Sequence, residues 1–205
     1  MTFRLGLTGS IGMGKSTTMA MFAARGHSVW DADAAVHRLY APGGAAVAPV
    51  SAAFPSVRTD AGGIDRAALR QVLARDPAAL QRLEAVVHPL VAEDREAAHA
   101  AARKAGARLA VYDIPLLFET GGDTTMHGIA VVSADAATQR ARVMARPGMT
   151  QEMLALILSR QMPDAEKRAR ADWIIPTGSL DVAEAAVDRI CDEILSRPDP
   201  EALHA

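Results

Sequence analysis

Five short apolar segments along the chain have the pattern of buried β-strands: residues 3–8, 28–30, 109–112, 129–132 and 173–175. Most of them lack the polar–apolar alternation of a half-exposed strand, as is typical of parallel strands covered on both faces. Segments with helical periodicity separate the strands. The order of elements therefore predicts an α/β protein with three layers and a five-stranded parallel sheet.

The segment between the second and third strands, residues 34–106, is much longer than a simple crossover requires. It is rich in Ala, Leu and Arg, and Asp65 and Asp76 each precede a helix-like run, as expected for N-caps. His88 is followed by Pro89, which indicates either the end of one helix and the start of the next, or a place in a binding site. We predict a helical insertion over residues 34–106.

A second helical region, residues 134–165, contains a predicted pair of helices at about 135–145 and 151–162. We call residues 134–165 the lid. The remaining core then comprises residues 1–33, 107–133 and 166–197, and the tail after Pro198 is expected to fray.

The composition narrows the class of protein. The chain has 205 residues, half of them hydrophobic, which suits one compact domain. A formal net charge of −2 argues against a nucleic-acid partner. No apolar run is long enough to cross a membrane, and the N-terminus lacks a signal-peptide pattern. The single cysteine, Cys191, lies beside the apolar stripe of a C-terminal helix and is interpreted as a buried thiol. We expect a cytoplasmic protein, monomeric or weakly homo-oligomeric.

The segment from Gly9 to Ser16 matches the phosphate-binding loop G-x-x-x-x-G-K-[ST] in full. It follows the first predicted strand and opens a predicted helix at about residues 15–25. Its glycines allow successive backbone N–H groups to point at one anion, and the helix start adds partial positive charge. Lys15 is expected to reach the β- and γ-phosphates, and Ser16 to bind Mg²⁺. The sequence thus predicts a nucleotide site.

A nucleotide site alone leaves kinases, GTPases and motor-type ATPases possible. The chain lacks the Asn-Lys-x-Asp with which GTPases read guanine and the Leu-Ser-Gly-Gly-Gln of transporter ATPases. Arginines concentrate between residues 138 and 170, which suits polyanionic phosphates. A kinase must also exclude water during transfer. The small size and the arginine-rich lid therefore favour a small-molecule kinase.

Three acidic residues are candidates for the chemistry. Asp33 follows the second strand, where it can orient and deprotonate an alcohol, although it also fits a helix N-cap. Asp113 ends the third strand, where an acid can hold Mg²⁺, although an Asp in a turn before proline is also common. Glu119 is a weaker candidate, because a surface carboxylate is the ordinary interpretation.

Several segments, in order, resemble the dephospho-CoA kinase family over nearly the whole chain. Residues 5–16 resemble its opening, Asp31-Ala32-Asp33 its second signature, and the run from Asp113 to Glu119 its most distinctive segment. Its inserted region is similar to Ile64-Asp65-Arg66 with Leu69, Leu83-Glu84 and His88-Pro89. Its lid and last-strand region is similar to Gln139-Arg140, Arg146, Arg160-Gln161, Lys167 and Ala171-Asp172.

The resemblance implies phosphorylation of the ribose 3′-hydroxyl of dephospho-CoA by ATP, with Mg²⁺, to give CoA. The catalytic residues it implies are Asp33 as base or orienter, Lys15, and Arg140 as a lid arginine on phosphates. The residues it implies for ATP are Gly9, Ile11, Gly12, Met13, Gly14, Lys15, Ser16 and Thr17. Those for the acceptor are Asp33, His88, Asp113 and Leu116, and those for Mg²⁺ are Ser16 and Asp113. The other arginines Arg142, Arg168 and Arg170 are interpreted as solvated helix faces.

The chain departs from the family pattern at three places. Ser10 stands where the family often has Gly, which is tolerable if its φ stays negative. Pro176-Thr177-Gly178-Ser179 lacks the family's Asn or Asp before Gly, so no adenine-reading side chain is assigned. The Gly/Thr-rich residues 121–128 match no known segment. Rival functions are a kinase for a nucleotide or cyclic polyol, and a nucleotide switch that transfers no phosphate.

Overall fold

The computed structural model describes residues 1–197 and divides them into two compact units. The first unit comprises residues 1–30 and 101–197, and the second comprises residues 31–100. The expected fraying of the tail after Pro198 concerns residues outside the described part of the chain.

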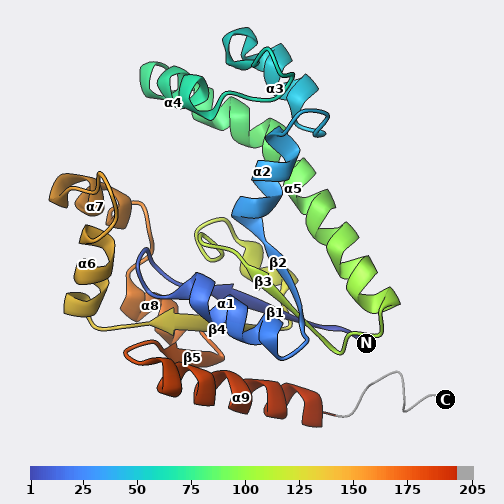
Figure 1. Ribbon diagram of the computed structural model, residues 1–205, viewed down its shortest axis with the longest axis vertical. Coiled ribbons are helices and arrows are strands. Elements are labelled where there is room, and N and C mark those ends of the chain that lie inside the picture. Colours follow the sequence, from blue (N-terminus) through green and yellow to red (C-terminus); the bar gives the residue numbers. More distant parts are fainter. Residues whose placement is uncertain (198–205) are drawn as a thin grey trace. The chain divides into compact units, whose positions relative to one another are not determined.

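The first unit is built on a five-stranded parallel sheet with the strand order β2-β3-β1-β4-β5 (Figure 1). The strands are β1 Phe3–Thr8, β2 Ser28–Asp31, β3 Leu109–Asp113, β4 Gly128–Ser133 and β5 Trp173–Pro176. Each predicted strand is present, with bounds that agree to within one residue. Near the end of β1, Leu7 is paired with Asp113 on one side and Ala130 on the other. The loop that leaves β1 therefore begins at the centre of the sheet.

Helices α1 (Lys15–Ala24) and α9 (Leu180–Ser196) cover one face of this sheet (Figure 1). Alternation along β1 decides which side chains meet them, because successive residues of a strand point to opposite faces. Leu5 and Leu7 are fully buried in the core formed with these helices. A Cβ built on Gly6 would instead lie 2.8 Å from the Leu117 side chain. The predicted three-layer α/β fold is confirmed.

The other face of the sheet is covered mainly by the segment that follows β3. Leu117 and Phe118 pack there against Ile129 and Val131 of β4. The remaining elements of the first unit are the short helices η2 (Gly122–Thr125), α6 (Ala136–Met144), α7 (Gln151–Leu158) and α8 (Asp164–Ala169). Helices α6 and α7 form the predicted helical pair of the lid.

Cys191 lies on the buried stripe of α9, as predicted from the helical spacing of its apolar neighbours. Burial raises the pKa of the Cys191 thiol to about 11, so the group is neutral at physiological pH. A neutral thiol is a poor nucleophile. The interpretation of Cys191 as a core residue is therefore confirmed.

The second unit has a hydrophobic core of its own. Its elements are α2 (Ala32–Tyr40), α3 (Val47–Ala53), η1 (Pro55–Val57), α4 (Arg66–Arg75) and most of α5 (Ala79–Lys104). Apolar side chains from all of these elements meet, including Tyr40, Val50, Val57, Leu69 and Leu83. The core explains how this helical stretch forms a compact body without a sheet.

Helix capping in this unit follows the sequence closely. The Asp65 carboxylate accepts hydrogen bonds from the N–H groups of Ala67 and Ala68, at 2.8 and 3.0 Å, and so caps α4. Asp76 accepts one from the Ala78 N–H just ahead of α5, at 2.9 Å. Both side chains satisfy backbone donors that a helix start leaves without intrahelical partners.

The expectation that His88-Pro89 ends one helix and starts another is wrong, because α5 runs without a break from Ala79 to Lys104 (Figure 1). Proline removes one hydrogen bond from the helical ladder. The apolar stripe nevertheless continues across it, since Leu83 and Val87 before the proline and Leu90 after it pack into the same core. Burial of that stripe outweighs the missing hydrogen bond.

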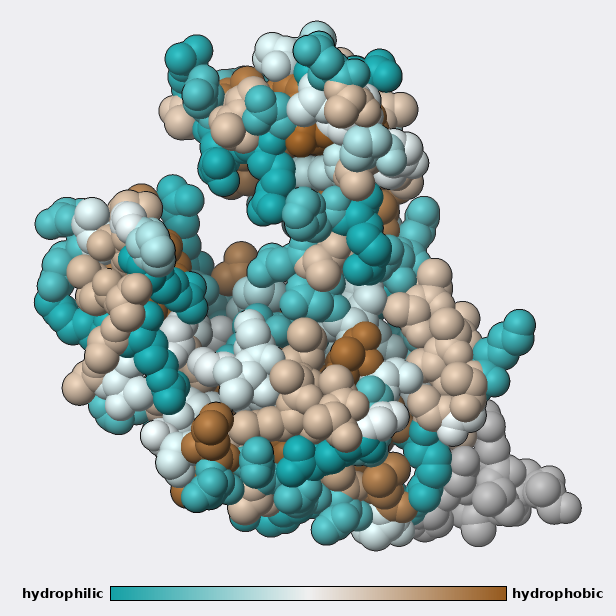
Figure 2. All heavy atoms as spheres, viewed as in Figure 1, coloured by the Kyte–Doolittle hydropathy of each residue, from teal (hydrophilic) through white to brown (hydrophobic). Residues whose placement is uncertain are grey.

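The visible surface of each unit is largely hydrophilic or intermediate, and strongly hydrophobic residues appear there in small groups (Figure 2). Exposed large apolar side chains include Met153 and Leu156 on α7 and Leu180 and Val182 on α9. Across residues 1–197, no helix combines the length and the apolar character needed to span a bilayer.

The Asp65 cap gives a test of the second unit's fold. Replacing Asp65 by Ala removes the acceptor for two N–H groups and is expected to lower the free energy of unfolding by about 1 kcal/mol. Asp65→Asn keeps a side-chain oxygen and is expected to lower the free energy of unfolding by only a few tenths of that amount. Urea unfolding followed by circular dichroism measures both. Equal losses for the two variants contradict capping as the role of Asp65.

Candidate active site

The loop from Gly9 to Ser16 joins β1 to α1 and has the backbone conformation that phosphate binding requires. Gly12 and Gly14 adopt positive φ angles of 78° and 88°, which side-chain-bearing residues rarely adopt. Gly9 is needed for a different reason, since a Cβ there would lie 2.4 Å from the Val132 side chain. Helix α1 starts at Lys15 without a side-chain cap. Its first N–H groups and its dipole are therefore directed at the loop.

Ser10 fits this loop because its φ angle is not positive: within the described residues, only glycines have positive φ. The sequence predicts that Ser10 is tolerable with a φ angle that is not positive, and this condition is met. Its side chain is buried, 5% exposed, and its carbonyl accepts a hydrogen bond from the Met13 N–H at 3.2 Å. The substitution of Ser for the family's usual Gly therefore leaves the loop geometry intact.

Lys15 and Asp113 form an ion pair next to this loop. Asp113 ends β3, directly beside β1, and its carboxylate is 2% exposed. The Lys15 ammonium contacts Asp113 Oδ1 and is itself mostly buried. An ammonium group with three donors can also bind phosphate oxygens, and the pair places a cation and an anion together beside the loop that leaves β1.

Ser16 and Thr17 lie on the first turn of α1, and both are exposed. The Ser16 hydroxyl and the Asp113 carboxylate are hard oxygen donors, the type that Mg²⁺ prefers. Among residues 1–197, no cluster of three or more His, Cys, Asp or Glu side chains could hold a metal unaided. A Mg²⁺ ion held by one or two protein oxygens, phosphates and water is consistent with this donor set.

The interpretation of Asp33 as an N-cap is wrong, because Asp31 takes that position. Asp31 Oδ1 accepts a hydrogen bond from the Ala34 N–H at 2.8 Å, and α2 begins at Ala32. Asp33 lies inside the first turn of α2 with an exposed side chain. Since Asp31 already caps the helix, the Asp33 carboxylate remains available for another role.

The other residues implied for the acceptor have different environments. His88 is exposed on α5. Leu116 follows β3 and is 39% exposed, whereas its neighbour Leu117 is fully buried. Leu116 is therefore an exposed leucine beside two buried hydrophobic residues, and its side chain is accessible for apolar contact with a ligand. Their acceptor roles stay predictions.

The two arginines of α6, Arg140 and Arg142, have different environments. Arg140 is exposed and its guanidinium donates to Gln151 Oε1 at the start of α7. Arg142, expected to be solvated, is half-buried, and both of its terminal nitrogens donate to Thr177. Thr177 in turn donates to the Met13 carbonyl of the phosphate-binding loop at 2.8 Å. The sequence interpretation of Arg142 was wrong, because periodicity along α6 does not reveal a partner 35 residues away.

Arg170 is also more than a solvated side chain. Its guanidinium donates to Asp123 Oδ2 at 2.8 Å and lies over the Phe118 ring, with 4.4 Å between the guanidinium carbon and the ring centroid. It thereby attaches the Gly/Thr-rich segment to the segment that follows β3. Arg168 is exposed, as expected.

Glu119 and Lys167 form a second ion pair that the sequence did not indicate. Lys167 is fully buried on α8, and its ammonium lies 2.8 Å from Glu119 Oε1. Burial favours the neutral acid, but the hydrogen bonds from Lys167 and from the Met162 N–H outweigh it, so the pKa of Glu119 is lowered. Glu119 is therefore a charged, mostly buried residue of an ion pair rather than a free surface carboxylate.

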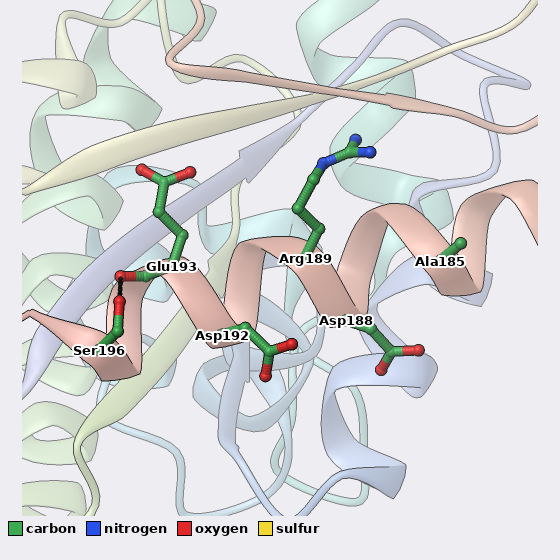
Figure 3. A pocket seen from close by; sticks show the side chains of 6 residues that line it. All are labelled: Ala185, Asp188, Arg189, Asp192, Glu193 and Ser196. Atoms are coloured by element: carbon green, nitrogen blue, oxygen red, sulfur yellow. Dashed lines mark hydrogen bonds between the residues drawn. The ribbon is translucent and has the colours of Figure 1, made fainter.

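A shallow surface hollow along α9 contains none of the predicted site residues. Ala185, Asp188, Arg189, Asp192, Glu193 and Ser196 line it (Figure 3). Asp188 pairs with Arg25, and Glu193 accepts hydrogen bonds from Trp173 and Arg197. The contacts with Arg25 and Trp173 attach α9 to the end of α1 and to β5.

Comparison with known proteins identifies the family. A family model described as dephospho-CoA kinase matches residues 3–181. The chain belongs to the dephospho-CoA kinase family. It is 55% identical over 194 residues to the dephospho-CoA kinase of Ruegeria pomeroyi, covering 95% of this chain and 96% of that protein. With the dephospho-CoA kinase of Cereibacter sphaeroides it shares 54% identity over 197 residues, covering 96% and 98%.

The fold is similar to that of a solved structure. The crystal structure of TT1252 from Thermus thermophilus has a TM-score of 0.82 to this chain at 33% identity, covering 96% of this chain and 99% of that one. The family model and the two relatives confirm, at the level of the family, the resemblance inferred from short motifs.

The contribution of the Lys167–Glu119 ion pair to the stability of the protein can be tested by substitution. Lys167→Met leaves the Glu119 carboxylate buried without its cation and is expected to cost about 3 kcal/mol of stability at neutral pH. In the parent protein the lowered pKa of Glu119 contributes stability above the carboxyl's ordinary pKa, and this contribution is lost as pH falls through the folded-state pKa. The deficit of Lys167→Met should therefore shrink towards acid pH.

The control is the double variant Lys167→Met with Glu119→Gln, in which neither charge is buried alone. It should be more stable than Lys167→Met by an amount that thermal unfolding resolves. A deficit for Lys167→Met that is independent of pH contradicts the assigned role of the pair.

Proposed function

We propose that this chain transfers the γ-phosphoryl group of ATP to the ribose 3′-hydroxyl of dephospho-CoA, giving ADP and CoA. The match to the dephospho-CoA kinase model over residues 3–181 carries the choice of acceptor. The loop from Gly9 to Ser16 supports the choice of donor, since its positive-φ glycines and helix start suit a triphosphate. Small molecules, rather than nucleic acid or a membrane, are the partners that this reaction needs.

The chemical step is a direct in-line transfer. The 3′-oxygen forms a bond to the γ-phosphorus as the bond between that phosphorus and the bridging oxygen of ADP breaks, and the hydroxyl proton leaves the 3′-oxygen. We assign Asp33 to orient that hydroxyl and accept its proton. Asp33 supports this assignment through its exposed carboxylate, which Asp31 relieves of capping.

Charge on the transferring group is the main obstacle, because protein catalysis of this step is mostly positioning and electrostatics. We assign Lys15 to the β- and γ-phosphates and Arg140 to the phosphates from the lid. Residues Gly9 and Ile11 to Thr17 are assigned to ATP, with loop N–H groups as donors. His88, Asp113 and Leu116 are assigned to the acceptor.

Mg²⁺ belongs to the proposal as well, with the Ser16 hydroxyl and the Asp113 carboxylate as its protein ligands. The ion would neutralise phosphate charge when bound. For that arrangement Asp113 must share its carboxylate between Lys15 and the metal, or release Lys15 to the phosphates.

ADP formation against a panel of acceptors tests the function. Dephospho-CoA is expected to stimulate ADP release strongly, whereas nucleotides and cyclic polyols are expected to do so weakly. Asp33→Asn keeps the shape of the side chain but removes the base, and it should lower kcat by about 10²- to 10⁴-fold with little change in the affinity for ATP. Equal ADP release with and without dephospho-CoA overturns the kinase assignment. A clear preference for another acceptor changes the substrate only.

A further inference from the structure

Two glutamines hold the two successive peptide groups that meet at Ile11 in the phosphate-binding loop. The Ile11 N–H donates to Gln161 Oε1 at 3.0 Å, and the Ile11 carbonyl accepts from Gln139 Nε2 at 2.8 Å. A backbone N–H can only donate and a carbonyl can only accept, so the two contacts define which amide atom of each glutamine faces Ile11. The glutamines are therefore not interchangeable: one must accept and the other must donate.

Holding the Ile11 carbonyl also orients the next N–H of the loop. In a trans peptide the carbonyl of one residue and the N–H of the next point in opposite directions. Gln139 therefore directs the Gly12 N–H away from α6. Thr177 has the same effect on the peptide group between Met13 and Gly14. Its hydroxyl donates to the Met13 carbonyl at 2.8 Å and so orients the Gly14 N–H. Alternate carbonyls turned outward leave alternate N–H groups turned towards an anion.

The two glutamines lie at opposite ends of the helical pair α6–α7. Gln139 is in α6, and Gln161 follows the end of α7. The loop and α6 are in close contact, since a Cβ added to Gly12 would lie 2.5 Å from the Val143 side chain and 3.1 Å from the Gln139 carbonyl oxygen. Gln139 in α6 and Gln161 just after α7 are thus both attached to one residue, Ile11, at the third position of the phosphate-binding loop.

We propose that Gln139 and Gln161 are positioning residues, which hold the peptide groups on either side of Ile11 so that the Gly12 N–H faces the phosphates and which couple the α6–α7 pair to bound ATP. The proposal rests on the proposed function for the presence of ATP and adds the residues that prepare its site. The Ile11 N–H already has a protein partner in Gln161, and the Met13 N–H donates to the Ser10 carbonyl. The proposal therefore assigns the Gly12 and Gly14 N–H groups to the anion.

Four variants test the proposal through the dissociation constant of ATP with Mg²⁺, measured by titration calorimetry. Gln139→Met and Gln161→Met remove one hydrogen bond each at similar side-chain length, and each should weaken ATP binding about 3- to 10-fold. Gln161→Glu keeps an acceptor for the Ile11 N–H, whereas Gln139→Glu leaves the Ile11 carbonyl without a donor. Both glutamates add the same charge near the same residue, Ile11, so the added charge does not distinguish them. Because only Gln139→Glu loses its hydrogen bond, it should bind ATP at least about 3-fold more weakly than Gln161→Glu.

Each result decides the question. Equal ATP affinities for the two glutamate variants, or affinities of both methionine variants equal to that of the parent, overturn the proposal. Thermal unfolding of every variant separates positioning from a general loss of structure, because positioning changes ATP binding at an unchanged melting temperature. If Gln139→Met does not fold, the comparison of Gln161→Met with Gln161→Glu carries the test, and rescue by glutamate is the expected outcome.

The measurement is independent of the acceptor. If dephospho-CoA is not phosphorylated but the four variants follow the expected order, the proposed function fails while the positioning role stands. If dephospho-CoA is phosphorylated and the four affinities are equal, the positioning role fails alone.

Discussion

Binding a triphosphate through main-chain N–H groups requires that the matching carbonyls point elsewhere and find donors there. In this chain the donors come from outside the loop: Gln139 binds the Ile11 carbonyl, and Thr177 binds the Met13 carbonyl. Arg142 then holds Thr177 through two hydrogen bonds. Since buried carbonyls without donors are costly, the loop conformation depends on α6 and on the end of β5 as much as on its own glycines.

The phosphate-binding loop is also held by contacts with the segment that follows β3. The acidic residues at the two ends of that segment, Asp113 and Glu119, each pair with a lysine, Lys15 and Lys167 respectively. Lysine is rare in this chain, with Lys104 as the remaining one. Between these two ion pairs, the Pro115 carbonyl accepts from both Thr8 Oγ1 and Lys167 Nζ. The segment is thus attached both to Thr8, the residue that precedes Gly9, and to α8.

The fold could be predicted largely from the sequence because its determinants are local. Apolar runs without alternation gave all five strands, and the phosphate-binding loop followed from residue types at neighbouring positions. The predictions that failed depend on contacts distant in sequence or on competition between neighbours. Arg142 finds its partner at Thr177, and Lys167 finds its own at Glu119. Pro89 remains inside α5 because apolar residues on both sides share one core. The periodicity of residues along a single helix cannot reveal partners that are distant in the sequence.

Competition between neighbours is clearest at Asp31 and Asp33. Two aspartates two residues apart at the start of a helix can both serve as caps, and residue type alone does not decide between them. The strand decides: β2 continues to Asp31, whose extended backbone places its carboxylate over the Ala34 N–H. Asp33 then falls inside the helix, where its side chain points outward and no first-turn N–H uses it as the cap. A strand one residue longer than the sequence indicated therefore separates the structural aspartate from the one available for chemistry.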